Sequence, residues 1–247
     1  MKMLYFAVVV TSLLVACSGA NKPEVKGEPV QLEFLETYFP GEIASQWQQA
    51  IIVADAKRKV LDEQDTNLRN VPLSELEKIP RLAMLLVPIG DFAMGSVAQK
   101  DMKAVDSILA MQEVKQLFPE DLKFMWSMNP DEMTSTNSEP RHVLYAIKMP
   151  ASKRNALTGK HIKDATVGYD ESSARVTIDL VMTEKGTDLW AQMTSDNVNR
   201  IIAICIDGKV ISAPRVINAI TGGSTQISGN FTVQEAEELA SGIRAGR

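Results

Sequence analysis

The sequence has few histidines and cysteines, the residues that most zinc sites use. Its 247 residues include two cysteines, Cys17 and Cys205, and two histidines, His142 and His161. A zinc site needs at least three protein ligands, and His161 with Asp164, a histidine–acid pair at helical spacing, supplies two. We therefore interpret His161 as a surface residue. The sequence predicts no metal site and no cofactor.

Positive charge is also scarce. The chain has 26 Lys and Arg against 31 Asp and Glu, which gives a formal net charge of −5, and it contains no basic block. Loss of Lys2 with a cleaved leader would make the charge −6. Proteins that bind nucleic acid concentrate Lys and Arg on one face or in one run. Nucleic acid is therefore not an expected partner.

The usual patterns of catalytic residues are missing. Ser212 or Ser195 can be combined with His161 on paper, but neither serine lies in the sharp strand-to-helix turn of a hydrolase nucleophile. The run Gly222-Gly223-Ser224-Thr225 lacks the lysine and the following helix of a phosphate-binding loop. We expect the chain not to be an enzyme, with no catalytic residues.

The longest apolar run lies at the amino terminus. It extends from Met3 to Ala16, interrupted only by Thr11 and Ser12, and Lys2 precedes it. A membrane-spanning helix needs about 20 apolar residues, which this run does not reach. The pattern is typical of a secretory signal sequence, so we predict a signal peptide over residues 1–16.

The run ends in Leu14-Val15-Ala16-Cys17, which resembles a bacterial lipobox. The resemblance implies cleavage before Cys17 and attachment of acyl chains such as palmitate to its sulfur and to the new amino terminus. The alternative is an ordinary signal peptide followed by a chance cysteine. A lipid would hold the chain on a membrane that faces an extracytoplasmic space. No acidic cluster follows Cys17, which favours the periplasmic side over surface display.

The Gly, Pro and polar content of residues 17–30 predicts a flexible tether. If Cys17 is acylated, Cys205 has no partner for an intramolecular disulfide, although the compartment would permit one. Cys205 lies within the apolar run Ile201–Ile206, so we interpret it as a small core residue.

For residues 31–142 we predict an α+β region. Apolar residues at helical spacing predict a helix between Ile43 and Leu61, and Asp101 is a candidate N-cap for a second helix. Short apolar runs predict strands at Leu82–Ile89, Phe92–Val97 and Leu122–Met128. Residues 129–140 are polar and predict an exposed loop. Four methionines are candidates to line an exposed groove: Met125, Met128, Met133 and Met149.

The C-terminal part shows the clearest local signals. Ile201–Ile206 predicts a buried strand, and Asp207-Gly208 predicts a two-residue hairpin turn before a return strand at Lys209–Ala213. Arg175–Met182 alternates polar and apolar residues, which indicates an antiparallel sheet with one exposed face. The same rules predict strands at His142–Lys148 and Ser224–Ser228, and a helix from Glu184 that turns Trp190 inward. Thr232 and Glu235 form a capping box that predicts the start of a final helix. The predicted buried stripe of that helix is Val233, Ala236, Leu239, Ala240 and Ile243.

Several motifs resemble the first periplasmic domain of SecD. They are LTGKHIKDA from Leu157, W..MT..N from Trp190, IAICIDGKVISAPRVINAITGGSTQISGNFT from Ile202, and EA..LA..IRAG near the end. GDFAMGSVAQKD and VKQLFPEDLKFMWS are similar to the preceding segment of fused SecDF proteins. Where the family usually has Gly after the Asn-Val pair, this chain has Asn199, a tolerated residue at a left-handed helix cap. The residues that carry the family motif, interpreted as structural or interaction residues, are Leu157, Thr158, Gly159, Asp207, Gly208, Ser212, Pro214, Gly222, Gly223, Gly229 and Phe231.

The resemblance implies an α+β fold of ferredoxin-like, split β-α-β character, in which helices cover one face of antiparallel sheets. We expect residues 143–247 to form a domain like the head of the SecD P1 domain. In the family, this domain is thought to contact polypeptides that leave the translocation channel, while proton coupling belongs to membrane helices that we do not expect in this chain.

The leading hypothesis is a lipid-anchored periplasmic accessory of protein export, with secreted polypeptides or Sec translocon components as partners. The alternative is a structural lipoprotein of an envelope complex that reuses the fold and has no role in export.

Overall fold

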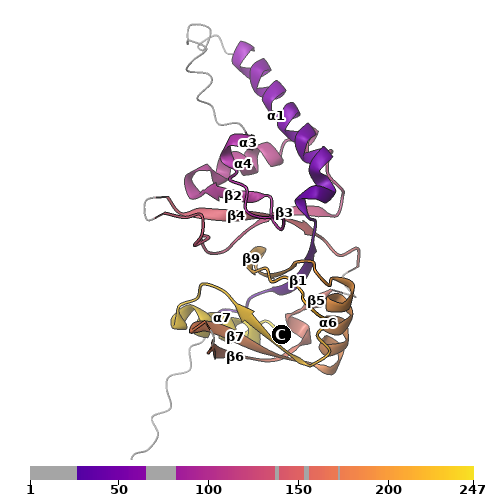
Figure 1. Ribbon diagram of the computed structural model, residues 1–247, viewed down its shortest axis with the longest axis vertical. Coiled ribbons are helices and arrows are strands. Elements are labelled where there is room, and N and C mark those ends of the chain that lie inside the picture. The colour runs from indigo at the N-terminus through magenta and orange to yellow at the C-terminus, as the bar shows by residue number, and fades with distance from the viewer. Residues whose placement is uncertain (1–26, 65–81, 137–138, 153–155, 172) are drawn as a thin grey trace, which may run out of the picture.

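The computed structural model describes residues 27–64, 82–136, 139–152, 156–171 and 173–247; for residues 57–64 it describes the backbone only. Figure 1 shows an elongated molecule with two halves. The upper half contains α1 (Ala44–Gln64), α3 (Leu82–Leu85), α4 (Met102–Leu109) and most of the strands β2, β3 and β4, and the lower half contains α6 (Glu184–Asp196), α7 (Val233–Ala245), β6 and β7. Strand β1 (Leu32–Thr37) runs from one half to the other.

The strands form two antiparallel sheets. In the larger sheet, β1 pairs on one side with β8 and on the other with β4 and β5; β2 and β3 also pair with β4, and β9 pairs with β8. Its other strands are β2 (Gly95–Ala98), β3 (Leu122–Trp126), β4 (Arg141–Lys148), β5 (Leu157–Thr158), β8 (Ile202–Ile206) and β9 (Lys209–Ser212). The smaller sheet has the order β10 (Ser224–Ser228), β7 (Arg175–Met182), β6 (Ile162–Asp170). The predicted α+β fold with antiparallel sheets is confirmed.

The turn between β8 and β9 has the predicted geometry. Asp207 and Gly208 have φ values of 49° and 76°, and positive φ at both central residues defines the turn type that matches the twist of a two-residue hairpin. The Asp207 carboxylate also accepts a hydrogen bond of 2.9 Å from the Gln31 amide, just before β1. Asn199 has φ 64°, so the left-handed conformation expected at this position is also confirmed.

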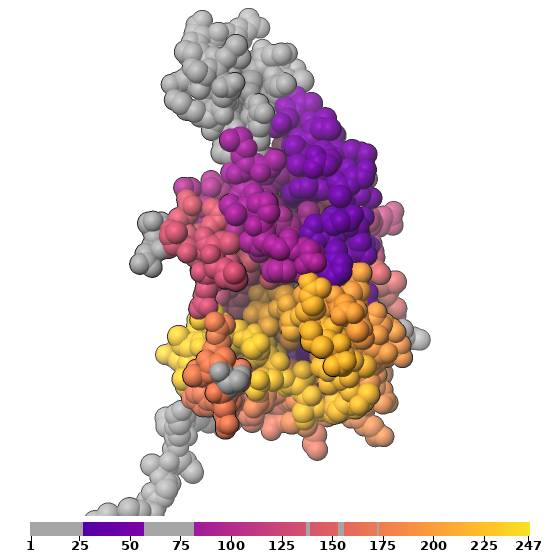
Figure 2. Space-filling model, in the orientation of Figure 1, coloured from indigo at the N-terminus to yellow at the C-terminus, as the bar shows by residue number. Residues whose placement is uncertain are grey.

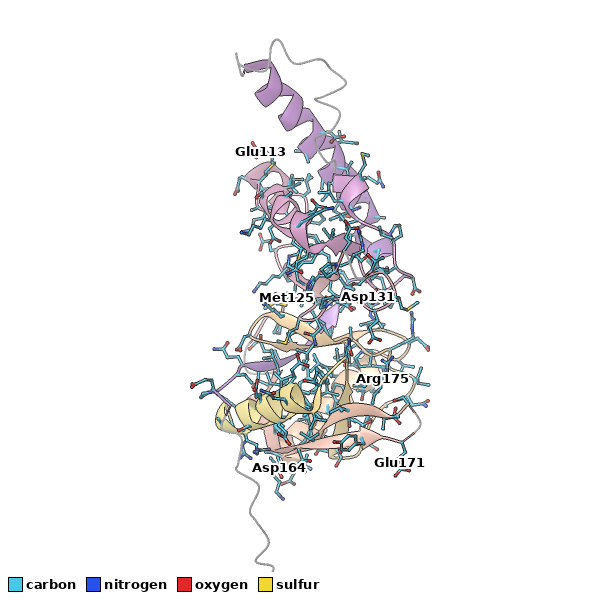
Figure 3. The ribbon with its side chains drawn as sticks, turned by 90° about the vertical axis from the view of Figure 1, so that its left-hand side faces the viewer. Glu113, Met125, Asp131, Asp164, Glu171 and Arg175 are labelled. Atoms are coloured by element: carbon cyan, nitrogen blue, oxygen red, sulfur yellow. The ribbon has the colours of Figure 1, made fainter. Side chains whose placement is uncertain are left out.

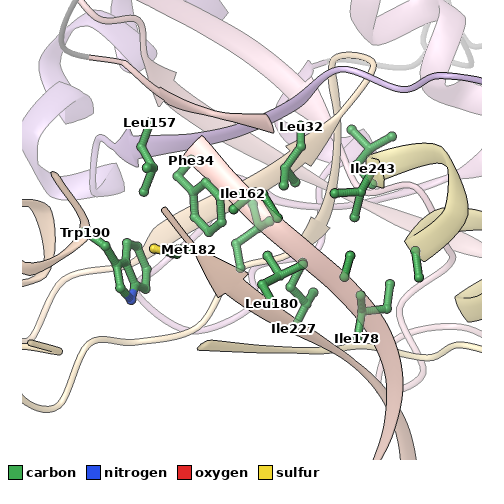
Figure 4. Packing of buried hydrophobic residues seen from close by; sticks show 14 of the residues in the cluster. Leu32, Phe34, Leu157, Ile162, Ile178, Leu180, Met182, Trp190, Ile227 and Ile243 are labelled. Carbon is green, nitrogen blue, oxygen red and sulfur yellow. The ribbon is translucent and has the colours of Figure 1, made fainter. Parts of the chain in front are cut away.

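The core of the lower half lies between the two sheets (Figure 4). Side chains of β1 and β8, among them Phe34 and Ile204, face Ile178 and Leu180 of β7. Trp190 of α6 closes one end of this core, with its ring centroid 5.2 Å from that of Phe34. Helix α7 closes another part of it with Ala236, Ala240 and Ile243. Strand β7 precedes α6 and strand β8 follows it, and these two strands lie in different sheets.

A second core lies inside a nearly closed ring of strands. The ladders run β3–β4–β1–β8–β9, and the ring closes where the Met128 amide donates to the Val210 carbonyl. Its interior is filled by Leu35, Met125, Val143, Tyr145, Ile147, Ala203, Cys205 and Val210. Burial raises the pKa of the Cys205 thiol to about 12, so Cys205 stays protonated and acts as a core residue, as predicted.

The third core lies in the upper half, where helices cover the outer face of β2, β3 and β4. Ala50 and Ala54 of α1 pack with Leu82, Val97, Val105 and Leu144. Trp47 of α1 stacks near Phe124 of β3, with ring centroids 5.9 Å apart, and Phe118 meets Phe124 edge to face at 5.1 Å. The predicted helix between Ile43 and Leu61 is confirmed by α1.

Three predictions were wrong in detail. The apolar run Leu82–Ile89 does not form a strand, because Leu82–Leu85 is a short helix and only Val87 makes a bridge, to Ser96; a short apolar run does not distinguish a buried strand from a buried helical turn. Val233 is 41% exposed and does not belong to the buried stripe of α7. Asp101 precedes α4, but its side chain makes no capping hydrogen bond.

Arg200 makes contacts that connect the two halves on one side of the molecule. Its guanidinium donates to the Thr37 carbonyl (2.9 Å) and pairs with the Glu42 carboxylate (2.8 Å). It also lies 4.6 Å from the centroid of the Phe39 ring, a cation–π distance. These contacts join the loop before β8 to the segment between β1 and α1. The hydrogen bond from Arg200 holds the pKa of Glu42 below its ordinary value of 4.5.

Replacing Glu42 with glutamine is expected to lower the free energy of unfolding at pH 7 by about 0.5–1 kcal/mol, because the pair is partly exposed and screened by solvent. Since the folded-state pKa of Glu42 is depressed, the stabilisation is present above pH 4.5 and disappears as the pH falls through the folded-state pKa. Urea unfolding of both chains from pH 7 to pH 3 measures this. Glu171→Gln, on the exposed turn after β6, is the control, and an equal effect of both substitutions would contradict the prediction.

Candidate functional site

A groove of about 350 Å³ opens where the two halves meet, and we call it the junction groove. It is formed by the loop after β3, the strands β4 and β9, the start of β7, and the turn between β10 and α7. Figure 3 shows Asp131 and Arg175, two of its lining residues, near the level at which the halves meet. Its lining residues are Ser127, Asn129, Pro130, Asp131, Glu132, Met133, Val143, Tyr145, Arg175, Val210, Ile211, Ser212, Ser228, Gly229 and Asn230.

The loop that forms the upper wall is held by the strands around it. The Ser127 hydroxyl donates to the Asn129 carbonyl (2.8 Å) and accepts from the Val143 amide (3.0 Å). The Asn129 amide group donates across the groove to the Asn230 carbonyl at 3.0 Å. These bonds fix the upper wall against β4 and against the turn before α7, so the groove has a defined width.

The groove combines apolar and polar contacts. Met133 is 94% exposed at its rim, and Ile211 is partly buried beside it. Arg175 and Glu132 form an ion pair of 3.3 Å across the opening. Burial raises the pKa of Tyr145 to about 12, with a smaller contribution from the charge of Asp131. The Tyr145 hydroxyl is therefore neutral at physiological pH and suited to donate to a carbonyl rather than to act as a base.

The edge of the smaller sheet leads into the same groove. The Met182 amide donates to the Gly223 carbonyl (2.8 Å), and the register then pairs Thr225 with Leu180 and Ile227 with Ile178. Hydrogen-bonded and non-bonded pairs alternate in an antiparallel ladder. The backbone groups of Ser224, Gln226 and Ser228 consequently point away from β7. In the space-filling view, the C-terminal part of the chain, coloured gold and yellow, forms much of the visible face of the lower half (Figure 2).

The opposite edge of that sheet is occupied. Arg244 and Arg247, at the end of α7, donate to the backbone carbonyls of Ala165 and Lys163 on β6. An edge strand with unpaired backbone groups can accept a further strand. Because α7 occupies the β6 edge, β10 is the edge of this sheet that is suited to accept one.

Two of the predicted motif residues lie in the junction groove, and the others support the fold around it. Ser212 and Gly229 line the groove. A Cβ at Gly229 would lie 2.5 Å from the Phe231 ring, so this position has no room for a side chain. The remaining residues lie in the lower core (Leu157, Phe231), at turns (Asp207, Gly208, Gly222, Gly223) and at strand ends or the short helix after β5 (Thr158, Gly159, Pro214). Cys17 lies outside the described residues.

The structure also places the residues considered for chemistry. His161 accepts a hydrogen bond from the Thr158 amide through Nδ1 (3.1 Å), so that nitrogen is not available to a serine. Burial lowers the pKa of His161. His142 is 8% exposed and its Nδ1 contacts the Ser127 carbonyl. Within the described ranges, no three His, Cys, Asp or Glu side chains gather closely enough to hold a metal ion.

The sequence predicts an exposed loop at residues 129–140, but it does not predict where this loop packs. In the structure, the loop forms the upper wall of the junction groove and faces β9 and β10. The exposed Met133 was the available signal, and its prediction as a groove residue is confirmed. Met125 was also a candidate, but it is 2% exposed inside the strand ring, so that prediction was wrong.

Among the described residues, none of the helices combines the length and the apolar content that a membrane span requires. The predicted signal peptide lies before residue 27, outside the described residues.

Comparison with known proteins gives a consistent set of relatives. Residues 135–247 match the family model described as SecDF, P1 head subdomain. The chain is 31% identical over 176 residues to the protein translocase subunit SecD of Rhodothermus marinus, covering 71% of this chain and 27% of that protein. It is 47% identical over 90 residues to SecD of Acidaminococcus fermentans, covering 36% and 21%. The chain thus spans about a quarter of the length of these relatives.

Solved structures of SecDF are also matched. One, titled as a membrane component that enhances protein export, has a TM-score of 0.37 and 19% identity, and the match covers 87% of this chain and 93% of that one. Another, a translocon-associated SecDF from Thermus thermophilus, has a TM-score of 0.31 and 17% identity, and the match covers 90% of this chain and 30% of that one.

Proposed function

We propose that this chain, which carries a SecD P1-like domain over residues 135–247, is an accessory of protein export that binds extended or partly folded polypeptides. The relatives are translocase subunits, which supports an association with the export channel. The binding step needs no cofactor and no bond cleavage.

The observation that carries the proposal is that the free edge of β10 leads into the junction groove. Ser228 belongs to both, because it ends the free edge of β10 and lines the groove. An extended polypeptide can pair its backbone with Ser224, Gln226 and Ser228 and place a side chain against Met133 and Ile211. Backbone pairing gives affinity with little dependence on sequence, which suits a binder of many different clients.

The chain would work at the periplasmic face of the envelope, held there by lipid on Cys17. This part of the proposal is supported by the lipobox-like Leu14-Val15-Ala16-Cys17. The partners would be secreted polypeptides and subunits of the Sec translocon. A structural lipoprotein of an envelope complex, without a role in export, is the competing function, but the free β10 edge is better explained by a chain that captures strands.

Photocrosslinking in cells tests the proposal. A photoreactive amino acid at Ser228 is expected to trap secreted polypeptides or translocon subunits. Gln226→Pro is expected to reduce the yield about tenfold, since it removes an outward amide without removing a ladder bond to β7. Gln226→Ala is the matched control, because it also loses the side-chain bond to Asp179 but keeps the amide. Equal yields from the two variants, or capture of a single stoichiometric envelope protein and no clients, would overturn the proposal.

A further inference from the structure

A second groove, of about 610 Å³, lies in the upper half between β3 and the helices α4 and α5 (Gln112–Lys115). We call it the upper groove. One wall is formed by Leu109 and Ala110 at the end of α4 together with α5, and the opposite wall by Leu122 and Phe124 of β3. Phe118 closes the groove between them.

The edge of β3 that borders this groove has outward-pointing backbone groups. The Met149 amide donates to the Asp121 carbonyl (2.7 Å) and the Ser127 amide to the Val143 carbonyl (2.8 Å). Both pairs belong to one register, so every second residue between them bonds to β4. Leu122, Phe124 and Trp126 therefore direct their backbone groups away from β4.

Both ends of the free edge of β3 already make backbone hydrogen bonds. At one end the Leu122 amide donates to the Pro119 carbonyl (3.0 Å). At the other end, Met128 donates to Val210 (2.8 Å), and β9 forms a parallel bridge there at Ser127. Among the described residues, the ladder of β3 itself is made with β4 alone. Between the two ends, the amide and carbonyl of Phe124 have no backbone partner among the residues that the structure describes, and Phe124 lines the upper groove.

We propose that an extended peptide from another protein binds in the upper groove as an added strand on β3. An extended backbone presents an amide and a carbonyl side by side and can therefore pair with both groups of Phe124. Leu109 and Phe118 provide apolar contacts for alternate side chains. The rim carries both signs of charge, with Lys115 and Lys123 beside Asp106 and Glu120, so the peptide would be apolar at alternate positions and of low net charge.

This inference rests on the upper half alone and does not depend on client binding at the junction groove. The probe is a short acetylated peptide in which valine and threonine alternate between two terminal lysines, labelled with fluorescein. Two control peptides carry N-methyl groups, one on every valine and the other on every threonine. Only one of these two sets of amides faces β3. Binding to the purified full chain, measured by fluorescence anisotropy, is expected to weaken about tenfold for one methylated peptide and to persist for the other.

Two variants, one just after α4 and one within it, locate the site. Ala110→Trp fills the upper groove at an exposed position and is expected to weaken binding about tenfold. Ala104→Trp introduces the same side chain at an exposed position of α4 outside the groove and should bind as the parent chain does. Equal affinity of both methylated peptides, equal affinity of both variants, or a dimer of this chain that Ala110→Trp dissociates would overturn the proposal.

Discussion

Replacing Cys17 with serine is expected to move the chain from the membrane fraction to the soluble fraction of the cell envelope. A thioether-linked lipid needs the cysteine sulfur, and serine at the same position leaves the apolar leader without an acceptor for the lipid. Two or more acyl chains give stable anchoring, because each buried methylene contributes about 0.8 kcal/mol. The measurement is fractionation after a carbonate wash, with the mass of the mature amino terminus determined in parallel.

Ser18→Ala is the matched control for this result. It changes the neighbouring residue and leaves Leu14-Val15-Ala16-Cys17 intact, so the chain should stay with the membrane. Two results would contradict the proposed anchor: a Cys17→Ser chain that has lost residues 1–16 and still sediments with the membrane, or a parent chain whose mature amino terminus carries no acyl mass. The second result would favour an ordinary signal peptide followed by a chance cysteine.

Replacing Trp190 with alanine is expected to lower the free energy of unfolding by about 3–5 kcal/mol, because it leaves a cavity in the lower core. Trp190 is 2% exposed and packs against Phe34 at 5.2 Å. Replacing it with phenylalanine should cost less than replacing it with alanine, because the cavity left behind is smaller. The indole Nε1 is buried without a hydrogen-bond partner among the described residues, so phenylalanine loses ring volume but also removes an unsatisfied donor. Urea unfolding of the purified chains measures both.

Val198→Ala, at a 41% exposed position just after α6, controls for a general sensitivity of this region and should change stability by less than about 0.5 kcal/mol. If phenylalanine proved as damaging as alanine at position 190, the indole nitrogen would have a partner that compensates for its burial, and the account of this core would be wrong.

The fold was predictable where the determinants are local. Asp207-Gly208 supplies both left-handed residues of one turn, and Thr232 with Glu235 forms the capping box before α7. The alternation of Arg175–Met182 places Ile178 and Leu180 inside, at 0% and 1% exposed. Each of these signals is contained in fewer than ten consecutive residues, so no knowledge of tertiary contacts is required.

The candidate site was less predictable because distant segments form it. Asn129 meets Asn230 across 101 positions of sequence, and Met128 pairs with Val210. No local sequence pattern predicts either contact. The helical turn at Leu82–Leu85 was missed for a related reason, since its apolar residues are selected by burial under α1 and α4 and not by strand pairing. The predicted boundary at residue 143 remains a prediction, although β4 crosses it.

The placement of β1 has a consequence for how the molecule reaches its native state. Leu32–Glu36 pairs along the whole of β8, more than 160 residues later, and Phe34 lies in the lower core. During synthesis or export, β1 can pair with β4 and β5 first, but its β8 side must wait until Ile206 has emerged, and such distant closure slows folding. A fragment trimmed to residues 135–247 would leave Ile202–Ile206 paired with β9 but without β1, and it would remove Leu32 and Phe34 from the core that contains Ile204. The portion matched by the family model is therefore smaller than the portion that must fold together.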